Sequence, residues 1–141
     1  MNYFLREKGG FVISTDPRML DKSAVFDFLA KAKWWADLTE ESLERAIENS
    51  LCFSLRNSDR QIGLARVITD YVTYAYLCDV FIEEEHRGHG LGSWMIRCLL
   101  EHPDLKHLKR VSLITHDSQS FYLNLKFQFA ADSNSYMERL Q

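Results

Sequence analysis

The amino-acid sequence predicts a mixed α/β fold, with one sheet of six to seven strands and four helices in a single domain over residues 1–141. Three observations predict this class. Short apolar runs of strand character alternate with segments whose apolar residues recur at helical spacing. The length suits one domain with a continuous core. The balance of 46% apolar and 26% charged residues is typical of a globular protein.

The N-terminal part is predicted to contain one strand and two helices. The apolar run 11–13 is ended by Asp16 and Pro17, which indicates a short strand. Apolar residues at helical spacing then predict a helix from residue 21 to about residue 33. Thr39 can cap a second helix, because its hydroxyl can accept a hydrogen bond from a free N–H group of the first turn.

Three strands are predicted in the middle of the chain. Segments 51–56 and 61–69 flank the polar turn 57–60, which is typical of a β-hairpin. Segment 73–82 follows with too little chain before it for a helix. We therefore expect it to run antiparallel to its predecessor.

The C-terminal part is predicted to alternate between helices and strands. A helix over 91–101 leads to a strand over 111–115, which we expect to run parallel to strand 73–82 because a helix crosses between them. A short helix over 118–125 follows. Segment 127–140 is expected to supply one or two final strands.

Composition narrows the range of partners and compartments. The net charge of −3 without a basic block argues against nucleic acid. Three cysteines without a CxxC pair argue against a disulfide framework or a zinc site and favour a reducing compartment. The histidines show no metal-binding spacing, so no metal is expected. No charged-then-apolar leader and no membrane-length apolar run is present, so we expect a cytoplasmic protein that does not contact a membrane.

A glycine-rich loop, Arg87-Gly88-His89-Gly90-Leu91-Gly92, joins the strand over 73–82 to the next helix. Glycine permits positive φ angles and leaves no Cβ in the way of a ligand. Such a loop can turn successive N–H groups inward, and the N-terminus of the following helix adds unpaired N–H groups and a positive dipole end. Together these features predict an anion site suited to a pyrophosphate.

Two nucleotide motifs do not fit this loop. A P-loop requires Gly-Lys-Ser/Thr at the start of the helix, whereas residues 92–94 are Gly-Ser-Trp. A dinucleotide-binding fold requires GxGxxG and an acidic residue about twenty positions later. Here the spacing is GxGxG, and Lys109 and Arg110 occupy the later region. A purely structural tight turn is the remaining alternative, although one glycine would suffice for it.

The loop resembles the central motif of the GNAT superfamily of acyl-CoA N-acyltransferases, Arg/Gln-x-x-Gly-x-Gly/Ala, through Arg87, Gly90 and Gly92. A second resemblance lies downstream, where Thr-His-Asp-Ser-Gln-Ser-Phe-Tyr over 115–122, followed by Phe127, is similar to the family's T-x-D-A-x-G-L-Y…G-F segment. The predicted order of elements agrees with a GNAT-like fold over nearly the whole chain.

The resemblance implies an N-acetyltransferase that uses acetyl-CoA as co-substrate. An amine would attack the thioester directly in a ternary complex, and a backbone N–H would stabilise the oxyanion. The positions implied for coenzyme A are Val80, Phe81 and Ile82 for the pantetheine arm and acetyl oxygen, and Arg87, Gly88, His89, Gly90, Leu91, Gly92 and Ser93 for the pyrophosphate.

Tyr122 matches the family's common general acid, which would protonate the leaving thiolate. The competing interpretation is a packed aromatic residue with its hydroxyl satisfied. The general base is left open, with Asp79 and Glu83 as candidates beside the key strand segment. Lys126 stands where the family has a glycine in a left-handed helix-ending turn, and a lysine is strained in that conformation.

The acceptor is the least defined part of the sequence reading. Trp34, Trp35 and Tyr76 are candidates for an aromatic pocket that attracts an ammonium group. Such aromatic residues are more often found in the core or at a subunit interface. A homodimer is therefore one of the assemblies that we consider. We expect a small-molecule primary amine as acceptor. A peptide or protein N-acetyltransferase and a non-catalytic module that senses coenzyme A are the alternatives.

Overall fold

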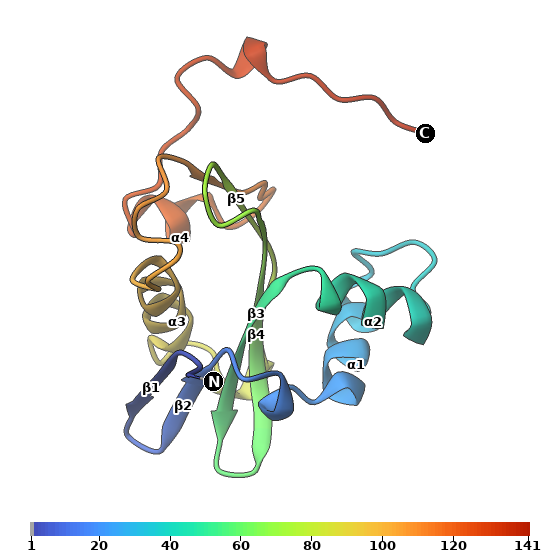
Figure 1. The fold of residues 1–141 in the computed structure, drawn as a ribbon, viewed down its shortest axis with the longest axis vertical. Coiled ribbons are helices and arrows are strands. Elements are labelled where there is room, and N and C mark those ends of the chain that lie inside the picture. The colour runs from blue at the N-terminus through green and yellow to red at the C-terminus, as the bar shows by residue number, and fades with distance from the viewer. Residues whose placement is uncertain (1) are drawn as a thin grey trace.

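The computed structural model describes residues 2–141, which form one six-stranded sheet with helices on both faces (Figure 1). The strands are β1 (Leu5–Lys8), β2 (Phe11–Ser14), β3 (Leu51–Asn57), β4 (Arg60–Thr69), β5 (Ala75–Ile82) and β6 (Val111–Ser112). The helices are α1 (Lys22–Ala32), α2 (Glu40–Glu48), α3 (Leu91–Leu100) and α4 (Gln119–Leu123). None of the helices in this described range is long and apolar enough to cross a membrane.

The strands lie in the sheet in the same order as in the chain, β1 to β6. Every neighbouring pair is antiparallel except β5 and β6, which run parallel with α3 in the connection between them. The predicted hairpin of β3 and β4, the antiparallel β5 and the parallel β6 are therefore confirmed. The mixed α/β class with four helices is confirmed as well.

The two faces of the sheet carry separate apolar clusters. Helices α3 and α4 pack on one face, where Met95, Leu99 and Tyr122 join residues of the strands. Helices α1 and α2 pack on the other face, where Val25 and Leu29 contact Leu64 of β4 (Figure 1). Because side chains alternate along a strand, β4 can serve both clusters and carries buried apolar residues on both faces.

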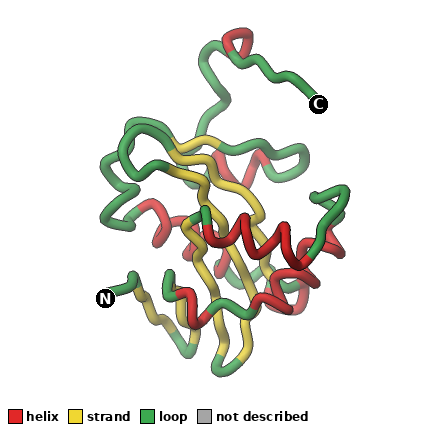
Figure 2. Tube along the Cα trace, turned by 45° about the vertical axis from the view of Figure 1, so that its right-hand side comes forward, coloured by secondary structure: helices red, strands yellow, loops and turns green. Residues whose placement is uncertain are grey.

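The helix ends follow the capping chemistry of the sequence. Asp21 accepts a hydrogen bond from the backbone N–H of Ala24 at the start of α1, and this helix ends at Lys33 in a left-handed conformation, with φ 56°. Thr39 and Ser42 form a reciprocal capping box at the start of α2, which confirms the predicted N-cap. Trp34 lies in the segment between the end of α1 at Lys33 and the N-cap of α2 at Thr39. Both helices lie on the same side of the sheet (Figure 2).

The sequence-based prediction is wrong at both ends of the chain. Strand β1 was not predicted, because all four of its residues are exposed and show no apolar alternation. The one or two strands expected within 127–140 are not formed. This segment leaves the sheet and contains only a 3₁₀ turn at Ser133–Ser135, within the polar run 132–135 that breaks any strand pattern (Figures 1 and 2). Strand β6 is also shorter than the predicted 111–115.

A bulge interrupts the pairing of β4 with β5 next to the glycine loop. Leu64 pairs with Phe81, and two residues later Arg66 pairs with Cys78. Two residues of β5, Asp79 and Val80, therefore lie opposite a single residue of β4. Asp79 takes a left-handed conformation, with φ 51°, within this bulge. The bulge thus overlaps the start of the segment 80–82 that is predicted to contact the pantetheine arm and the acetyl oxygen.

Candidate functional site

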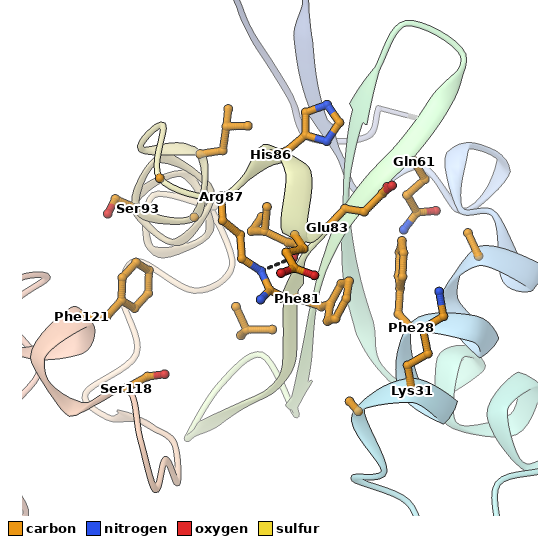
Figure 3. Close-up of a pocket in the computed structure, with 18 of the residues that line it drawn as sticks. Phe28, Lys31, Gln61, Phe81, Glu83, His86, Arg87, Ser93, Ser118 and Phe121 are labelled. Carbon is orange, nitrogen blue, oxygen red and sulfur yellow. Dashed lines mark hydrogen bonds between the residues drawn. The ribbon is translucent and has the colours of Figure 1, made fainter.

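A cavity of about 1130 Å³ lies between α1 on one side and the glycine loop and α4 on the other, with the end of β5 as its floor (Figure 3). The predicted site residues that line it are Trp34, Val80, Phe81, Ile82, Arg87, Gly88, Gly90, Leu91, Gly92, Ser93 and Tyr122. Three predicted residues, Trp35, Tyr76 and His89, do not line it. The structure therefore gathers most of the predicted donor-side residues around one space.

The glycine loop has the backbone geometry that an anion site requires. Gly88 and Gly90 take left-handed conformations, with φ 82° and 79°, and a Cβ added to either would meet no atom within 4 Å. Gly90 is the N-cap of α3, and no side chain caps that helix. The first-turn N–H groups of α3 therefore have no side-chain partner, and the positive end of the helix dipole points toward the cavity wall.

Gly92 has a different role from the two left-handed glycines. It lies in the first turn of α3, and a Cβ there would approach the Phe121 ring to 3.4 Å and the Ile82 side chain to 3.8 Å. Both distances are ordinary van der Waals contacts, and they show that α3 and α4 lie close together beside the end of β5. This close approach brings Tyr122 of α4 to the wall of the same cavity.

Strand β5 opens away from β6 as it approaches the cavity. The two strands pair only at Ala75 with Val111 and at Tyr76 with Ser112. From residue 77 to residue 82 the side of β5 that faces β6 has no ladder partner in the described chain. The backbone groups at this end of β5 are therefore available to an elongated polar ligand, as they would be at a sheet edge.

Arg87 is turned back over the end of β5. Its Nε donates a hydrogen bond to the carbonyl oxygen of Ile82 at 2.7 Å, and its guanidinium lies 5.4 Å from the centre of the Phe81 ring (Figure 3). On the α1 side of the cavity, Phe28 stacks on Phe81, with ring centres 4.5 Å apart. Phe81 therefore contacts both the loop and the α1 wall.

Tyr122 is buried beside the cavity. The ring packs edge-on against Phe121 and Phe127, with ring centres 4.9 Å and 5.5 Å away. Burial raises the pKa of Tyr122 to about 12. Desolvation is the one cause of this shift, and no hydrogen bond from another residue contributes to it. Tyr122 is thus a protonated phenol at neutral pH that lines the cavity.

The turn after α4 fixes the position of Tyr122. Lys126 takes a left-handed conformation, with φ 68°, in place of the glycine expected from the resemblance. The backbone N–H of Phe127 donates to the carbonyl oxygen of Tyr122, and that of Lys126 donates to Leu123, both at 3.1 Å. These two bonds form a Schellman motif, and the Phe127 ring supplies its usual hydrophobic contact with the Tyr122 ring. The left-handed turn is thus formed although a lysine occupies the position of the family's glycine.

Only one of the two candidate bases lines the cavity. Glu83 lines the cavity and forms an ion pair with Arg60, which also pairs with Glu85. Asp79 does not line the cavity. It is buried on the α2 side, where Arg66 donates from Nε to its carboxylate at 2.7 Å. Of these two candidates, Glu83 is therefore the one that can touch a ligand in this cavity.

Glu83, Glu85 and His86 present ligand atoms within 4.8 Å of one another, a spacing that a metal ion could use. Arg60 already pairs with both carboxylates, so one of their two negative charges is compensated without a metal ion. The arrangement is that of a local ion-pair cluster at the rim of the cavity.

The sequence-based prediction did not include several residues that line or shape the site. Phe28 and Lys31 fall within the helix predicted from residue 21 to about residue 33, but only the tertiary fold places α1 against the end of β5. Gly63 of β4 was also missed. A Cβ there would lie 2.9 Å from the carbonyl oxygen of Phe81, so the glycine permits close packing at the site. An isolated glycine within a strand is the signal that could have identified it.

Comparison with known proteins shows the family to which this architecture belongs. Residues 20–127 match the model of the acetyltransferase (GNAT) family. A candidate acetyltransferase from Gibberella zeae is 38% identical over 136 residues, which cover 82% of this chain and 77% of that protein. The crystal structure of a candidate GNAT acetyltransferase from Xanthomonas campestris pv. campestris has a TM-score of 0.88 at 38% identity, with 96% of each chain covered.

A more distant structure shares the fold. A candidate acetyltransferase from Clostridium acetobutylicum, solved with acetyl-CoA, has a TM-score of 0.66 at 16% identity, and the match covers 99% of this chain and 95% of that one. The GNAT family uses acetyl-CoA as acetyl donor. On the family match and the close relatives, this chain belongs to the GNAT family and is an acyl-CoA-dependent acetyltransferase.

Proposed function

We propose that this chain transfers the acetyl group of acetyl-CoA to a primary amine of a small molecule, by direct attack in a ternary complex. The observation that carries the proposal is the single cavity that continues from the glycine loop to α1. Donor and acceptor can occupy such a space together, so no acetyl-enzyme intermediate is needed. Residues 1–141 act as one N-acetyltransferase domain in this proposal.

The donor occupies the side formed by the loop, α3 and the open end of β5. Backbone N–H groups of 87–93, including those of His89 and Ser93, bind the pyrophosphate together with the N-terminus of α3. The pantetheine arm lies along the part of β5 that lacks a β6 partner. Val80, Phe81 and Ile82 offer backbone groups there, and a backbone N–H at the bulge stabilises the oxyanion that forms during attack.

Tyr122 is the proposed general acid. The amine nitrogen bonds to the carbonyl carbon, and the carbonyl π electrons move to the oxygen. When the tetrahedral intermediate collapses, the C–S bond breaks and Tyr122 gives its proton to the sulfur. The structural support is a cavity-lining phenol that burial keeps protonated, with a raised pKa of about 12. Glu83, which lines the cavity beside the end of β5, accepts the amine proton directly or through water.

The acceptor occupies the side formed by α1. Phe28 and Trp34 supply aromatic surface there, and Asp27 and Lys31 supply both signs of charge one helical turn apart. Trp34 is 54% exposed and can contact a ligand, whereas Trp35 and Tyr76 lie outside this wall. We propose a small amine with an apolar or aromatic body as the acceptor. A peptide acceptor would have to enter along this same α1 side.

We propose further that the reaction needs no metal, that the protein acts in the cytoplasm without a membrane or nucleic-acid partner, and that it forms a homodimer. The observation behind the dimer is the C-terminal segment, in which Phe129, Met137 and Leu140 are 71%, 89% and 86% exposed. Strand β6 has β5 as its one neighbour among the described strands. Deletion of residues 128–141 should convert a dimer into a monomer in sedimentation equilibrium, and an unchanged mass would contradict this contact.

The transfer reaction is tested by following thiol release from acetyl-CoA with a panel of small amines, amino acids and peptides. We expect release that requires an acceptor and yields the N-acetylated amine by mass spectrometry. Release only with peptides would replace the small amine by a peptide acceptor. Binding of coenzyme A without release on any acceptor would overturn the transfer reaction and favour a sensing module.

A further inference from the structure

We infer that Arg66, Asp79 and Trp35 form a positioning network that holds the β5 bulge in the conformation the transfer reaction needs. The inference rests on the proposed function, because it assigns these residues to the backbone that receives the acetyl oxygen. None of the three lines the cavity. They act through Val80 and Phe81, which follow Asp79 directly and do line it.

The three side chains contact one another on the α2 side of the sheet. Arg66 donates from Nε to Asp79 Oδ2 at 2.7 Å, and Trp35 donates from Nε1 to Asp79 Oδ1 at 3.3 Å. The Arg66 guanidinium lies 5.3 Å from the Trp35 ring centre and donates a further bond from Nη1 to Ser50 Oγ at 3.0 Å. Both carboxylate oxygens of Asp79 are therefore occupied, and each from a different element.

Stability alone does not explain this ion pair. The side chains of Arg66 and Asp79 are only 11% and 6% exposed, so both charges have lost most of their hydration. The attraction between such charges often does no more than offset the lost hydration, and apolar residues of similar volume can serve a fold equally well. We therefore assign the ion pair a structural role, which is to hold the backbone conformation of Asp79.

The backbone of Asp79 has an unusual, left-handed conformation. A residue other than glycine is disfavoured at φ 51°, although aspartate tolerates it better than most. Such a conformation persists where the surroundings over-determine it. Hydrogen bonds to both carboxylate oxygens fix the side chain, and the fixed side chain fixes the backbone that carries it. The network thus holds the bulge in a state that the backbone alone does not favour.

Loss of the bulge would change the cavity directly. Asp79 and Val80 face the single residue Ala65, so a β5 without the extra residue would pair with β4 one position out of register. A one-residue slip sends side chains to the opposite face of the sheet. The Phe81 ring would then leave its stack on Phe28, and the N–H groups next to the acetyl carbon would point elsewhere. Donor and acceptor sides would both lose alignment.

Trp35 extends the network to the acceptor wall. It lies two residues beyond the left-handed end of α1 at Lys33, and its neighbour Trp34 lines the cavity. The indole N–H bond to Asp79 therefore ties the α1–α2 connection to the same carboxylate that holds the bulge. The Asp79 carboxylate thus holds two parts of the site in a fixed relative position. One is the β5 backbone that would bind the oxyanion, and the other is the segment that borders the acceptor.

The test separates this positioning role from donor binding and from folding. We would compare wild type with Arg66→Met, Asp79→Asn and Trp35→Phe by three measurements: affinity for coenzyme A, the ¹³C chemical shift of bound [1-¹³C]acetyl-CoA, and kcat with an active acceptor. Trp35→Phe keeps a ring over Arg66 and loses only the indole donor. Lys22→Met is the matched control, since it removes a cation from the exposed ion pair with Glu44 outside the cavity.

We expect affinity for coenzyme A to stay within about threefold in every variant, because the pyrophosphate binds at the loop. The carbonyl shift should move toward that of free acetyl-CoA in Arg66→Met, and kcat should fall about a hundredfold with little change in the donor KM. Trp35→Phe should show the same pattern to a smaller extent, and Arg66→Lys should restore part of the activity. The control should match wild type.

The outcomes are distinguishable. A wild-type protein that binds no coenzyme A would remove the proposed function itself. Wild-type binding with an unchanged carbonyl shift and kcat in folded Arg66→Met would overturn the network. If Arg66→Met fails to fold, Trp35→Phe decides the matter, because an unchanged shift and kcat in that variant would also overturn it.

Discussion

Replacement of Tyr122 by phenylalanine removes one hydroxyl from the wall of the cavity and leaves the packing of the ring intact. The ring keeps its edge-on contacts with Phe121 and Phe127. No hydrogen bond from another residue contributes to the raised pKa of this hydroxyl, so its loss should leave no buried group unsatisfied. The free energy of unfolding should therefore change by less than about 0.5 kcal/mol.

The effect on catalysis should be much larger. A general acid contributes about 10²–10⁴ in rate, which corresponds to roughly 3–5 kcal/mol of activation free energy. Tyr122→Phe should lower kcat by that factor and leave the affinity for coenzyme A unchanged. The assay is steady-state thiol release with saturating acetyl-CoA and acceptor, beside urea unfolding of the same variant. Tyr3→Phe, which alters a tyrosine outside the cavity lining, is the control.

The pH profile adds a second check on the same residue. Burial raises the pKa of Tyr122 to about 12, so the phenol stays protonated up to pH values well above neutrality. Wild-type kcat should therefore show no loss of the acid form between about pH 8 and pH 10. Full activity of Tyr122→Phe at neutral pH would refute the assignment, and so would equal losses in Tyr122→Phe and Tyr3→Phe.

Three further predictions concern the scaffold and are measured by urea unfolding. Gly63→Ala should destabilise the fold by about 1–3 kcal/mol, because its Cβ would lie 2.9 Å from the Phe81 carbonyl oxygen; an unchanged midpoint would contradict this contact. Lys126→Gly should stabilise it by about 1 kcal/mol, because φ is 68° there, and a loss of stability would show that the lysine makes a compensating contact. Burial raises the pKa of Cys52 to about 12 and that of Cys78 to about 11, against 9.0 in the unfolded chain. Both thiols stay neutral in the folded state while the unfolded state ionises, so stability should be full below pH 9 and fall as the pH rises from 9 toward 11; a flat profile would contradict the burial of these thiols.

The sequence predicted the donor side of the site well because that side is local in the chain. A strand, a glycine loop and a helix follow one another without interruption from residue 75 to residue 100, and each has its own periodicity or turn signal. Gly88 and Gly90 take the positive φ angles that justify glycine. The position of Tyr122 depended on the family resemblance, and the structure adds the turn at Lys126 that holds it.

The acceptor side could not be predicted because it depends on packing between distant segments. Trp34 and Trp35 look equivalent in the sequence, yet one lines the cavity and the other donates to Asp79, 44 residues away. The position of the bulge at Asp79 depends on how β4 and β5 pair, and no glycine nearby in the sequence indicates it. Phe28 was correctly read as apolar, but only the docking of α1 shows that it faces Phe81.

The affinity of this protein for coenzyme A, measured by calorimetry on three forms, tests the central claim most directly. Gly90→Ala places a Cβ in the left-handed N-cap of α3, and Gly10→Ala does the same in the turn between β1 and β2, where φ is 85° and a Cβ also meets open space. We predict one coenzyme A bound per wild-type chain, affinity at least about tenfold weaker in Gly90→Ala, and unchanged affinity in Gly10→Ala. Absence of binding in wild type, or equal weakening in the two variants, would contradict a pyrophosphate site at the glycine loop.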